Sequence, residues 1–143
     1  MTQIARRPVS NDAEPIGSSN KQLTQLYAQL IAEHSTDPIA ILDAAARVEW
    51  VNSAYEQVTE YSLDETVGRM PGDTLTGPKT DRAVLRELMR AGPERRSIRR
   101  EVIQYRKSGE EYWSEILLTP IIGEDDEISH YLVIARDISE RKA

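Results

Sequence analysis

The sequence predicts an α+β fold in which short helices pack on an antiparallel sheet. The main observation is a pair of runs, 98–104 and 112–119, whose side chains alternate in period two on either side of Ser108-Gly109. Alternation around a turn dipeptide is the strongest short-range signal of a β-hairpin. Two shorter apolar runs precede this hairpin, one follows it, and helical patterns lie between them. The expected order is therefore a helix, two strands, short helices, a longer helix and three strands.

The hairpin is apolar on both of its faces. Trp113 and Leu117 share one face. Tyr112, Ile116 and Leu118 share the other. A sheet with two apolar faces must be covered on both. We expect one cover to be the core of the domain, and the other to be a helix or a second chain.

Composition narrows the function classes. The chain has 143 residues, enough for one domain, and a net charge of −6, which argues against a nucleic-acid partner. It contains no cysteine, which excludes disulfides, thiolate metal sites and cysteine nucleophiles. No apolar run is long enough to cross a bilayer, so we expect no membrane association and a cytoplasmic location.

The first part of the chain divides into two expected segments. Residues 1–19 have the composition of a flexible tail, and residues 20–35 carry a narrow apolar helical stripe. This helix either packs on its own domain or forms a homodimer by lying on the outer face of the sheet; the sequence leaves both open. The candidate dimer residues, from this stripe and the outer sheet face, are Leu23, Leu26, Tyr27, Leu30, Trp113, Leu117 and Ile134.

Strands and caps can be placed along the rest of the chain. Strands are expected at 39–42, 48–51 and 129–136, the last after an acidic turn. Asn52 is expected to cap a short helix ending at Thr59. A further short turn of helix is indicated by a Ser-x-x-Glu capping box at 62–65, and an irregular segment by the glycines and proline of 68–73.

The longer helix has clear start and stop signals. Thr80 or Asp81 can cap it, and Ala91-Gly92-Pro93 is expected to end it. We expect Gly92 to adopt a left-handed conformation, followed by a proline that cannot continue the helix. Its apolar face consists of Val84, Leu85, Leu88 and Met89.

Several strings, taken together, resemble the Per-Arnt-Sim (PAS) sensory family, and within it the light-oxygen-voltage (LOV) branch. They are residues 51–55, 59–69, 77–81, 105–109, 112–113, 119–120 and 136–142. The resemblance implies a five-stranded antiparallel sheet in the order 2-1-5-4-3 with helices over one face. It also implies a PAS domain at 36–139, with 140–143 beginning a linker helix. That linker leads to a C-terminal output domain, such as a histidine kinase or cyclase, and Asp137 would relay the signal to it.

The resemblance also raises the question of a flavin. LOV domains use a cysteine to form a flavin adduct, and the matching place here is about Pro71. Positions that face the flavin correspond to Gln104, Ser114 and Ala135, and alanine cannot hydrogen-bond. The expectation is therefore no fixed cofactor, with non-covalent FMN or FAD as the alternative. Haem is not expected, because the longer helix has no histidine.

The resemblance also suggests where a ligand would bind. The candidate pocket residues are Met70, Leu88, Val102, Gln104, Ser114, Ile116 and Ala135. No metal site and no catalytic constellation is recognisable, so the chain is interpreted as a non-enzyme. The favoured function is a sensory and dimerisation module. The alternatives are a flavin photoreceptor or redox sensor, and a sensor of an uncharged aromatic or acyl metabolite.

Two charged features are interpreted as surface. The arginines of 95–100 are expected to be solvated and accompanied by acidic neighbours, and the acids of 124–127 to form a solvated turn. Glu65 and Lys107 occupy positions that, by the resemblance, form a surface ion pair.

Overall fold

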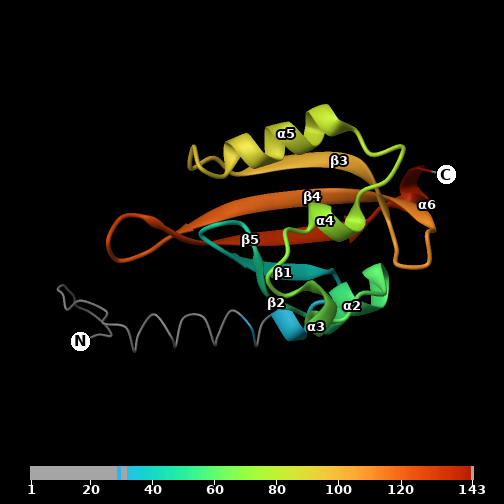
Figure 1. Ribbon diagram of the computed structural model, residues 1–143, viewed down its shortest axis with the longest axis horizontal. Helices are drawn as coiled ribbons and strands as arrows, with labels where there is room; N and C mark the ends of the chain where they lie inside the picture. Colours follow the sequence, from blue (N-terminus) through green and yellow to red (C-terminus); the bar gives the residue numbers. More distant parts are fainter. Residues whose placement is uncertain (1–28, 30–31, 143) are drawn as a thin grey trace.

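The five strands form one antiparallel sheet, as the sequence predicts. The computed structural model describes residue 29 and residues 32–142. The strands are β1 (Ile39–Asp43), β2 (Val48–Val51), β3 (Ile98–Tyr105), β4 (Glu111–Ile122) and β5 (Ile128–Asp137). Their order is β2-β1-β5-β4-β3, and each neighbouring pair is antiparallel (Figure 1). The expected strand order is confirmed.

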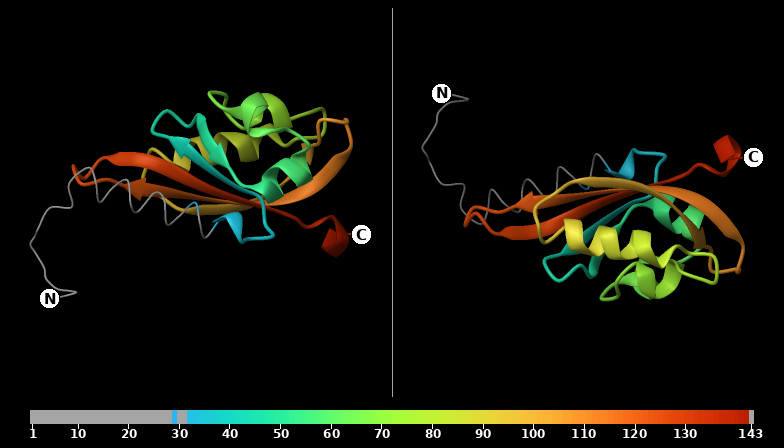
Figure 2. Two further views of the ribbon diagram at one scale, coloured as in Figure 1. Left: turned by 90° about the horizontal axis from the view of Figure 1, so that it is seen from below. Right: turned by 90° about the horizontal axis from the view of Figure 1, so that it is seen from above.

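Helices cover one face of this sheet. They are α2 (Ser53–Thr59), α3 (Leu63–Thr66), α4 (Gly72–Leu75) and α5 (Arg82–Ala91), with α6 (Ser139–Lys142) following β5. Figure 2 shows α2 to α5 gathered on the same side of the sheet, while α6 lies beyond its end. The core of the domain lies between these helices and the sheet.

The predicted caps hold two ends of this layer together. The Asn52 side-chain oxygen accepts from the backbone N–H of Tyr55 at 3.0 Å and of Ile39 at 2.9 Å, so it caps α2 and fixes β1 as well. The capping box of Ser62 and Glu65 is also present at α3. Both predictions are confirmed. Asn52 caps its own helix and also bonds β1, which the local sequence pattern does not predict.

The sequence left open whether Thr80 or Asp81 caps the start of α5, and the structure shows which of them does. Asp81 is the cap, accepting from the backbone N–H of Ala83 and Val84. Thr80 is buried instead, and its hydroxyl donates to the Ile103 carbonyl at 2.8 Å. Thr80 therefore ties the start of α5 to β3.

The expected left-handed conformation of Gly92 is wrong. Its φ is −55° and its ψ is −60°, an ordinary helical conformation. The glycine is needed for space: a Cβ at this position would lie 2.8 Å from Tyr131 Cε1. The positive φ of this turn, 63°, falls on Arg95. A second difference is α4, which occupies part of the segment expected to be irregular.

The two sheet faces differ in how completely they are buried. Residues such as Ala40, Leu42 and Val133 face the helices and form the core. On the other face, Trp113, Leu117 and Ile134 are half-buried. The remaining candidate dimer residues, Leu23, Leu26, Tyr27 and Leu30, lie outside the described residues, as do the expected tail and most of the expected helix at 20–35.

Candidate ligand pocket

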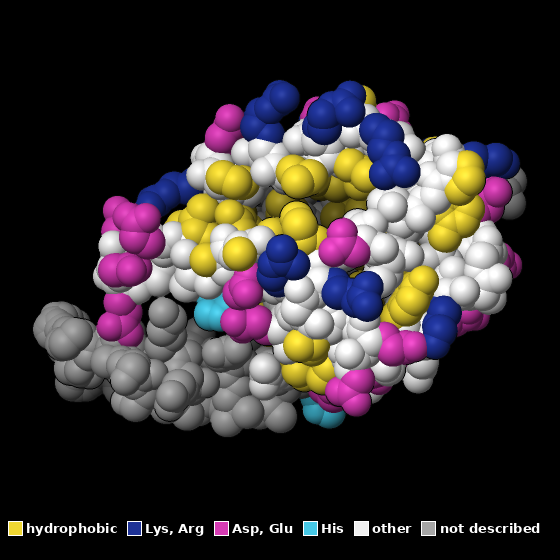
Figure 3. All heavy atoms as spheres, in the orientation of Figure 1, with side chains coloured by type: hydrophobic (Ala, Val, Ile, Leu, Met, Phe, Trp, Pro, Cys, Tyr) yellow, Lys and Arg dark blue, Asp and Glu magenta, His cyan; other side chains and the backbone are white. Residues whose placement is uncertain are grey.

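A cavity lies between the inner face of the sheet and the helices α4 and α5. Its volume is about 520 Å³. Figure 3 shows hydrophobic side chains gathered around a hollow on this face of the molecule. The strands supply Leu42, Ile116 and Val133, and the helices supply Leu75 and Leu88. A mostly apolar hollow of this size is the usual setting for a small-molecule ligand.

Five of the seven sequence-predicted pocket residues meet at this cavity. They are Met70, Leu88, Gln104, Ile116 and Ala135. Val102 and Ser114 do not line it: they are 1% and 0% exposed and are buried on the same sheet face. Alternation put them on the correct face, but it could not show which side chains the helices would cover.

Several residues that line the cavity were not predicted from the sequence. Tyr55 reaches the cavity from α2, Arg82 and Met89 from α5, and residues 44–46 from the turn between β1 and β2. Met89 is 61% exposed, so it stands at the mouth. The signal for Met89 was its place on the apolar stripe of the helix. The position of the 44–46 turn depends on sheet packing, for which the chain carries no local signal.

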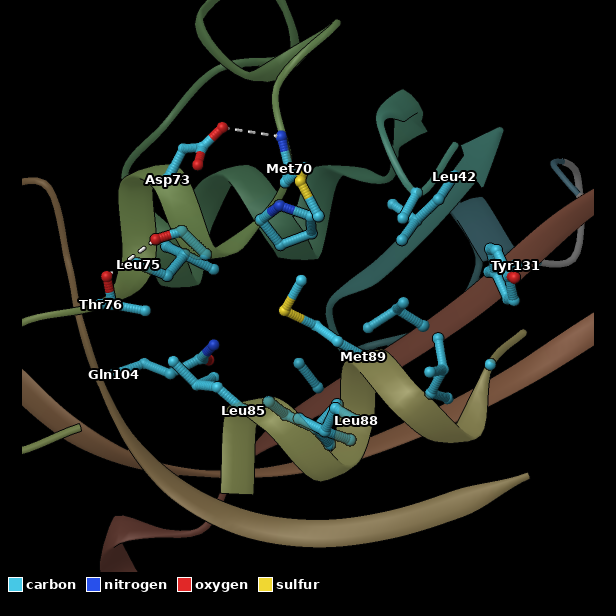
Figure 4. A pocket seen from close by; sticks show the side chains of 18 of the residues that line it. Leu42, Met70, Asp73, Leu75, Thr76, Leu85, Leu88, Met89, Gln104 and Tyr131 are labelled. Atoms are coloured by element: carbon cyan, nitrogen blue, oxygen red, sulfur yellow. Dashed lines mark hydrogen bonds between the residues drawn. The ribbon is translucent and has the colours of Figure 1, made fainter. Parts of the chain in front are cut away.

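The cavity is polar at one end and apolar at the other. In Figure 4, Gln104 and Thr76 lie at one end, Leu42 and Tyr131 at the other, and Met89 between them. The start of α5 lies at the Gln104 end, because Thr80 is bonded to Ile103 of β3. The end of α5 lies at the Tyr131 end, where that ring packs against the helix terminus.

Some polar groups in and near this cavity have no partner among the described residues. The hydroxyls of Tyr55 and Ser114 are buried in this state. A buried hydroxyl without a hydrogen bond costs about 1–3 kcal/mol. Burial raises the pKa of Tyr55, so its hydroxyl stays protonated and able to donate. Of the two, Tyr55 lines the cavity, and its donor is therefore available to a ligand.

Gln104 connects the cavity to the hairpin turn. Its side-chain oxygen accepts from the Tyr112 hydroxyl at 3.4 Å. The Arg106 guanidinium lies over the Tyr112 ring, 4.3 Å from its centroid. Arg106 also donates to the Val58 carbonyl at 2.7 Å, to Glu110 at 2.9 Å and to Asp137 at 2.9 Å. A continuous series of contacts therefore runs from the cavity to the end of β5.

Asp137 carries these contacts to α6. Its second carboxylate oxygen accepts from the Ser139 N–H at 3.0 Å, and the Ser139 hydroxyl accepts from the Trp113 N–H at 3.0 Å. Partial burial opposes ionisation of Asp137. The bonds from Ser139 and Arg106 outweigh it and hold the pKa of this carboxyl below its usual value. The carboxylate is thus charged at neutral pH and bridges the hairpin turn and the helix that follows β5.

The other charged features behave as surface. Arg96 pairs with Glu94 at 2.7 Å and Arg100 with Glu87 at 3.1 Å, so these arginines have acidic neighbours as expected. The predicted ion pair of Lys107 with Glu65 is present. Within residues 32–142, no cluster of three or more histidines and carboxylates is placed to hold a metal ion. None of the helices in the described part of the chain is long and apolar enough to cross a membrane.

The side chains of the cavity match part of a flavin's hydrogen-bonding groups. An isoalloxazine ring presents several hydrogen-bonding atoms along one edge; Gln104 and Tyr55 can bond such atoms, whereas Ile116 and Ala135 cannot. Arg82 is the cation among the lining residues, and the carboxylate of Asp73 also lines the cavity. With no cysteine in the sequence, a cysteinyl adduct cannot form.

Comparisons with known proteins identify the family. The chain is 35% identical over 108 residues to the bacterioopsin transcriptional activator of Halobacterium salinarum, covering 73% of this chain and 16% of that protein. It is 29% identical over 123 residues to the nitrogen fixation regulatory protein of Klebsiella oxytoca, covering 86% of this chain and 24% of that protein. The chain thus spans about a quarter or less of the length of these relatives.

A solved structure and a family model agree with these relatives. The LOV domain from a blue-light activated histidine kinase of Erythrobacter litoralis superposes with a TM-score of 0.67 at 28% identity, covering 72% of this chain and 96% of that one. The model of the PAS fold matches residues 26–138. Since this match takes in well over half of the sequence, the chain belongs to the PAS fold family.

Proposed function

We propose that this chain is the sensory module of a longer signalling protein, in which a small ligand in the cavity changes the position of α6. The observation that carries the proposal is the series of contacts from Gln104 through Tyr112 and Arg106 to Asp137. The relatives support it, because their names describe a transcriptional activator and a regulatory protein of which the matching region is a small part. In this proposal the module is cytoplasmic and not itself an enzyme. An output domain such as a histidine kinase or cyclase follows it.

Amide hydrogen exchange tests the coupling without knowledge of the ligand. Gln104→Leu removes the acceptor of the Tyr112 hydroxyl and frees that ring to move. We expect faster exchange at residues 138–142, because Asp137 and α6 depend on Arg106, which packs on the same ring. Met89→Leu, at the mouth and outside this series of contacts, is the matched control and should leave the exchange rates unchanged. Equal rates in Gln104→Leu and the unaltered protein would contradict the proposal.

The proposed module is also a homodimer. The half-buried apolar residues Trp113, Leu117 and Ile134 on the outer sheet face support this, together with the apolar stripe at Leu23, Leu26, Tyr27 and Leu30. A charge in such an interface opposes association. Leu117→Arg should therefore give monomers by light scattering. Val67→Arg is the control: this apolar residue follows the end of α3 and is 49% exposed, so the change should leave the mass unchanged.

A second candidate is a photoreceptor or redox sensor with non-covalent FMN or FAD. The observation that favours it is the superposition on a LOV domain. An absorbance scan of the purified protein, with mass spectrometry of the supernatant after denaturation, distinguishes the candidates. A bound flavin gives a structured visible band and the mass of FMN or FAD. A colourless protein whose supernatant contains another small compound supports the metabolite sensor.

A further inference from the structure

The shape of the cavity separates a polar end from a long apolar end. Apart from the tyrosines Tyr55 and Tyr131, the polar members of the lining are Asp73, Thr76, Arg82 and Gln104. Gln104 and Thr76 lie together in Figure 4, and Arg82 begins the helix whose start is bonded to β3 at this end. The opposite end is walled by small and apolar groups: Leu42, Ala44, Ala45, Pro93 and Tyr131. A ligand that matches both ends is elongated, with one polar head.

The groups free to bind that head are hydrogen-bond donors. The Gln104 oxygen is engaged by Tyr112, which leaves its amide nitrogen. The Tyr55 hydroxyl has no partner among the described residues, and Arg82 lines the cavity from the first residue of α5. Thr76 donates its hydroxyl proton to the Gly72 carbonyl at 2.8 Å, and one of the two carboxylate oxygens of Asp73 accepts from the Met70 N–H at 3.1 Å. A head that only accepts hydrogen bonds suits this set, and a carboxylate is such a group.

The apolar end favours a flexible chain over a rigid ring system. The alanines of the 44–46 turn leave room along the wall, and Met89 at the mouth is unbranched and adaptable. Each methylene buried there should tighten binding roughly fourfold at most. The gain should stop once the chain reaches the wall at Tyr131.

From these three observations we propose that the cavity binds a medium-chain fatty acid, with its carboxylate at Gln104, Tyr55 and Arg82 and its chain running toward Tyr131. This inference rests on the proposed sensory function and names the ligand class that the cavity would sense.

Isothermal titration of the delipidated full chain tests the class. The probes are the saturated acids from hexanoate to hexadecanoate, kept below the concentrations at which they form micelles. We expect the affinity to rise with each methylene and then level off or fall as the cavity is filled. Dodecanol and methyl dodecanoate, compared with dodecanoate, test the head group. Dodecanoate should bind tightest, by about tenfold or more, because hydrogen bonds to a charged group are the stronger ones.

Three variants test the orientation. Gln104→Leu and Arg82→Gln should each weaken dodecanoate binding about tenfold and bring the acid closer to the alcohol. Ala44→Trp, in an exposed turn at the far end, should shift the optimum to shorter chains while keeping the preference for the carboxylate. Arg86→Gln, on the same helix but outside the cavity lining, is the matched control and should change neither property.

The outcomes separate this inference from the function on which it rests. Binding that does not depend on chain length, or a preference for dodecanol, overturns the fatty-acid class. Tight binding of FMN without binding of any fatty acid also overturns the fatty-acid class, but it leaves the proposed ligand-sensing function in place. Failure of every probe, together with unchanged exchange at α6 in Gln104→Leu, overturns the sensory function as well.

Discussion

The cavity and the hairpin turn differ in whether their polar side chains have hydrogen-bond partners. At the turn, Arg106 is bonded to Val58, Glu110 and Asp137, so its donors are taken up by the protein itself. In the cavity, the Tyr55 hydroxyl is buried without a partner among the described residues. Satisfied polar groups stabilise one structure, whereas unsatisfied ones cost free energy until something binds. The satisfied groups of the turn therefore stabilise the fold and connect it to α6, whereas the cavity keeps a donor for a ligand.

The largest expected effect is at Arg106. Arg106→Met keeps the apolar stem but removes the side-chain donor to the Val58 carbonyl and one of the two partners of Asp137. We expect the free energy of unfolding to fall by about 3 kcal/mol in urea titrations, since several bonds to a largely buried charge are lost together. Arg99→Met removes an ion pair of 3.7 Å between the exposed Arg99 side chain and Glu115, which keeps Arg141 as a partner; this control should cost little. Equal effects of the two would mean that the turn is ordinary surface.

Gly92 tests how the far end of the cavity is built. Gly92→Ala places a Cβ against the Tyr131 ring, which must shift. We expect a loss of about 1–3 kcal/mol in thermal or urea unfolding, as for other overpacked sites. Gly72→Ala is the matched control, because its nearest neighbour would lie at 3.8 Å and its φ is not left-handed. That change should be neutral or slightly stabilising. A neutral Gly92→Ala would contradict the close approach.

Most substitutions in a protein core lower the free energy of unfolding, but Tyr55→Phe should raise it. Removing a hydroxyl that has no partner should raise the stability of the unliganded protein by about 1 kcal/mol. Thr59→Val is the control: its hydroxyl donates to the Tyr55 carbonyl at 2.7 Å, so its loss should destabilise by about as much. Unfolding of both variants by urea gives the comparison directly. Destabilisation by Tyr55→Phe would show that its hydroxyl is satisfied.

Asp137 predicts a pH dependence at the turn. Because its pKa is lowered in the folded state, its charge stabilises the fold fully above the pKa of an unfolded aspartate, about 3.9. This contribution to the free energy of unfolding is lost as the pH falls below the pKa of an unfolded aspartate and toward the lower pKa of Asp137 in the folded protein. Asp137→Asn should cost about 1 kcal/mol at neutral pH, and the gap to the unaltered protein should close in acid. A gap that is constant from neutral to acidic pH would contradict this assignment.

The smallest effect is expected at Lys107. Its ion pair with Glu65 connects the turn to α3, but both side chains are largely exposed. Exposed pairs contribute little and are screened by salt. Lys107→Met should leave the urea midpoint nearly unchanged at low and high ionic strength. A clear, salt-dependent loss of stability in Lys107→Met would mean that the Lys107–Glu65 pair stabilises the turn together with Arg106 and Asp137.

Local patterns were sufficient for most of the fold. Period-two alternation predicted the hairpin, and the side chains of Asn52 and Ser62 marked two helix starts, because these signals depend only on neighbouring residues. They were insufficient at Gly92, where a stop signal suggested left-handed backbone and the real constraint was the Tyr131 ring, 39 residues later in the sequence. The same limit applied to Val102 and Ser114, whose face was predicted but whose distance from the cavity was not.

The strands, the caps, the absence of a reactive thiol and the family resemblance could all be predicted from the sequence, because each depends on residue type and short spacing. Which donors are free depends on the tertiary structure. Whether Tyr55, Gln104 or Arg106 has a partner depends on strands and helices that are far apart in the chain and meet only when the sheet closes over its helices. The chemistry of the site is set by this difference between satisfied and unsatisfied groups.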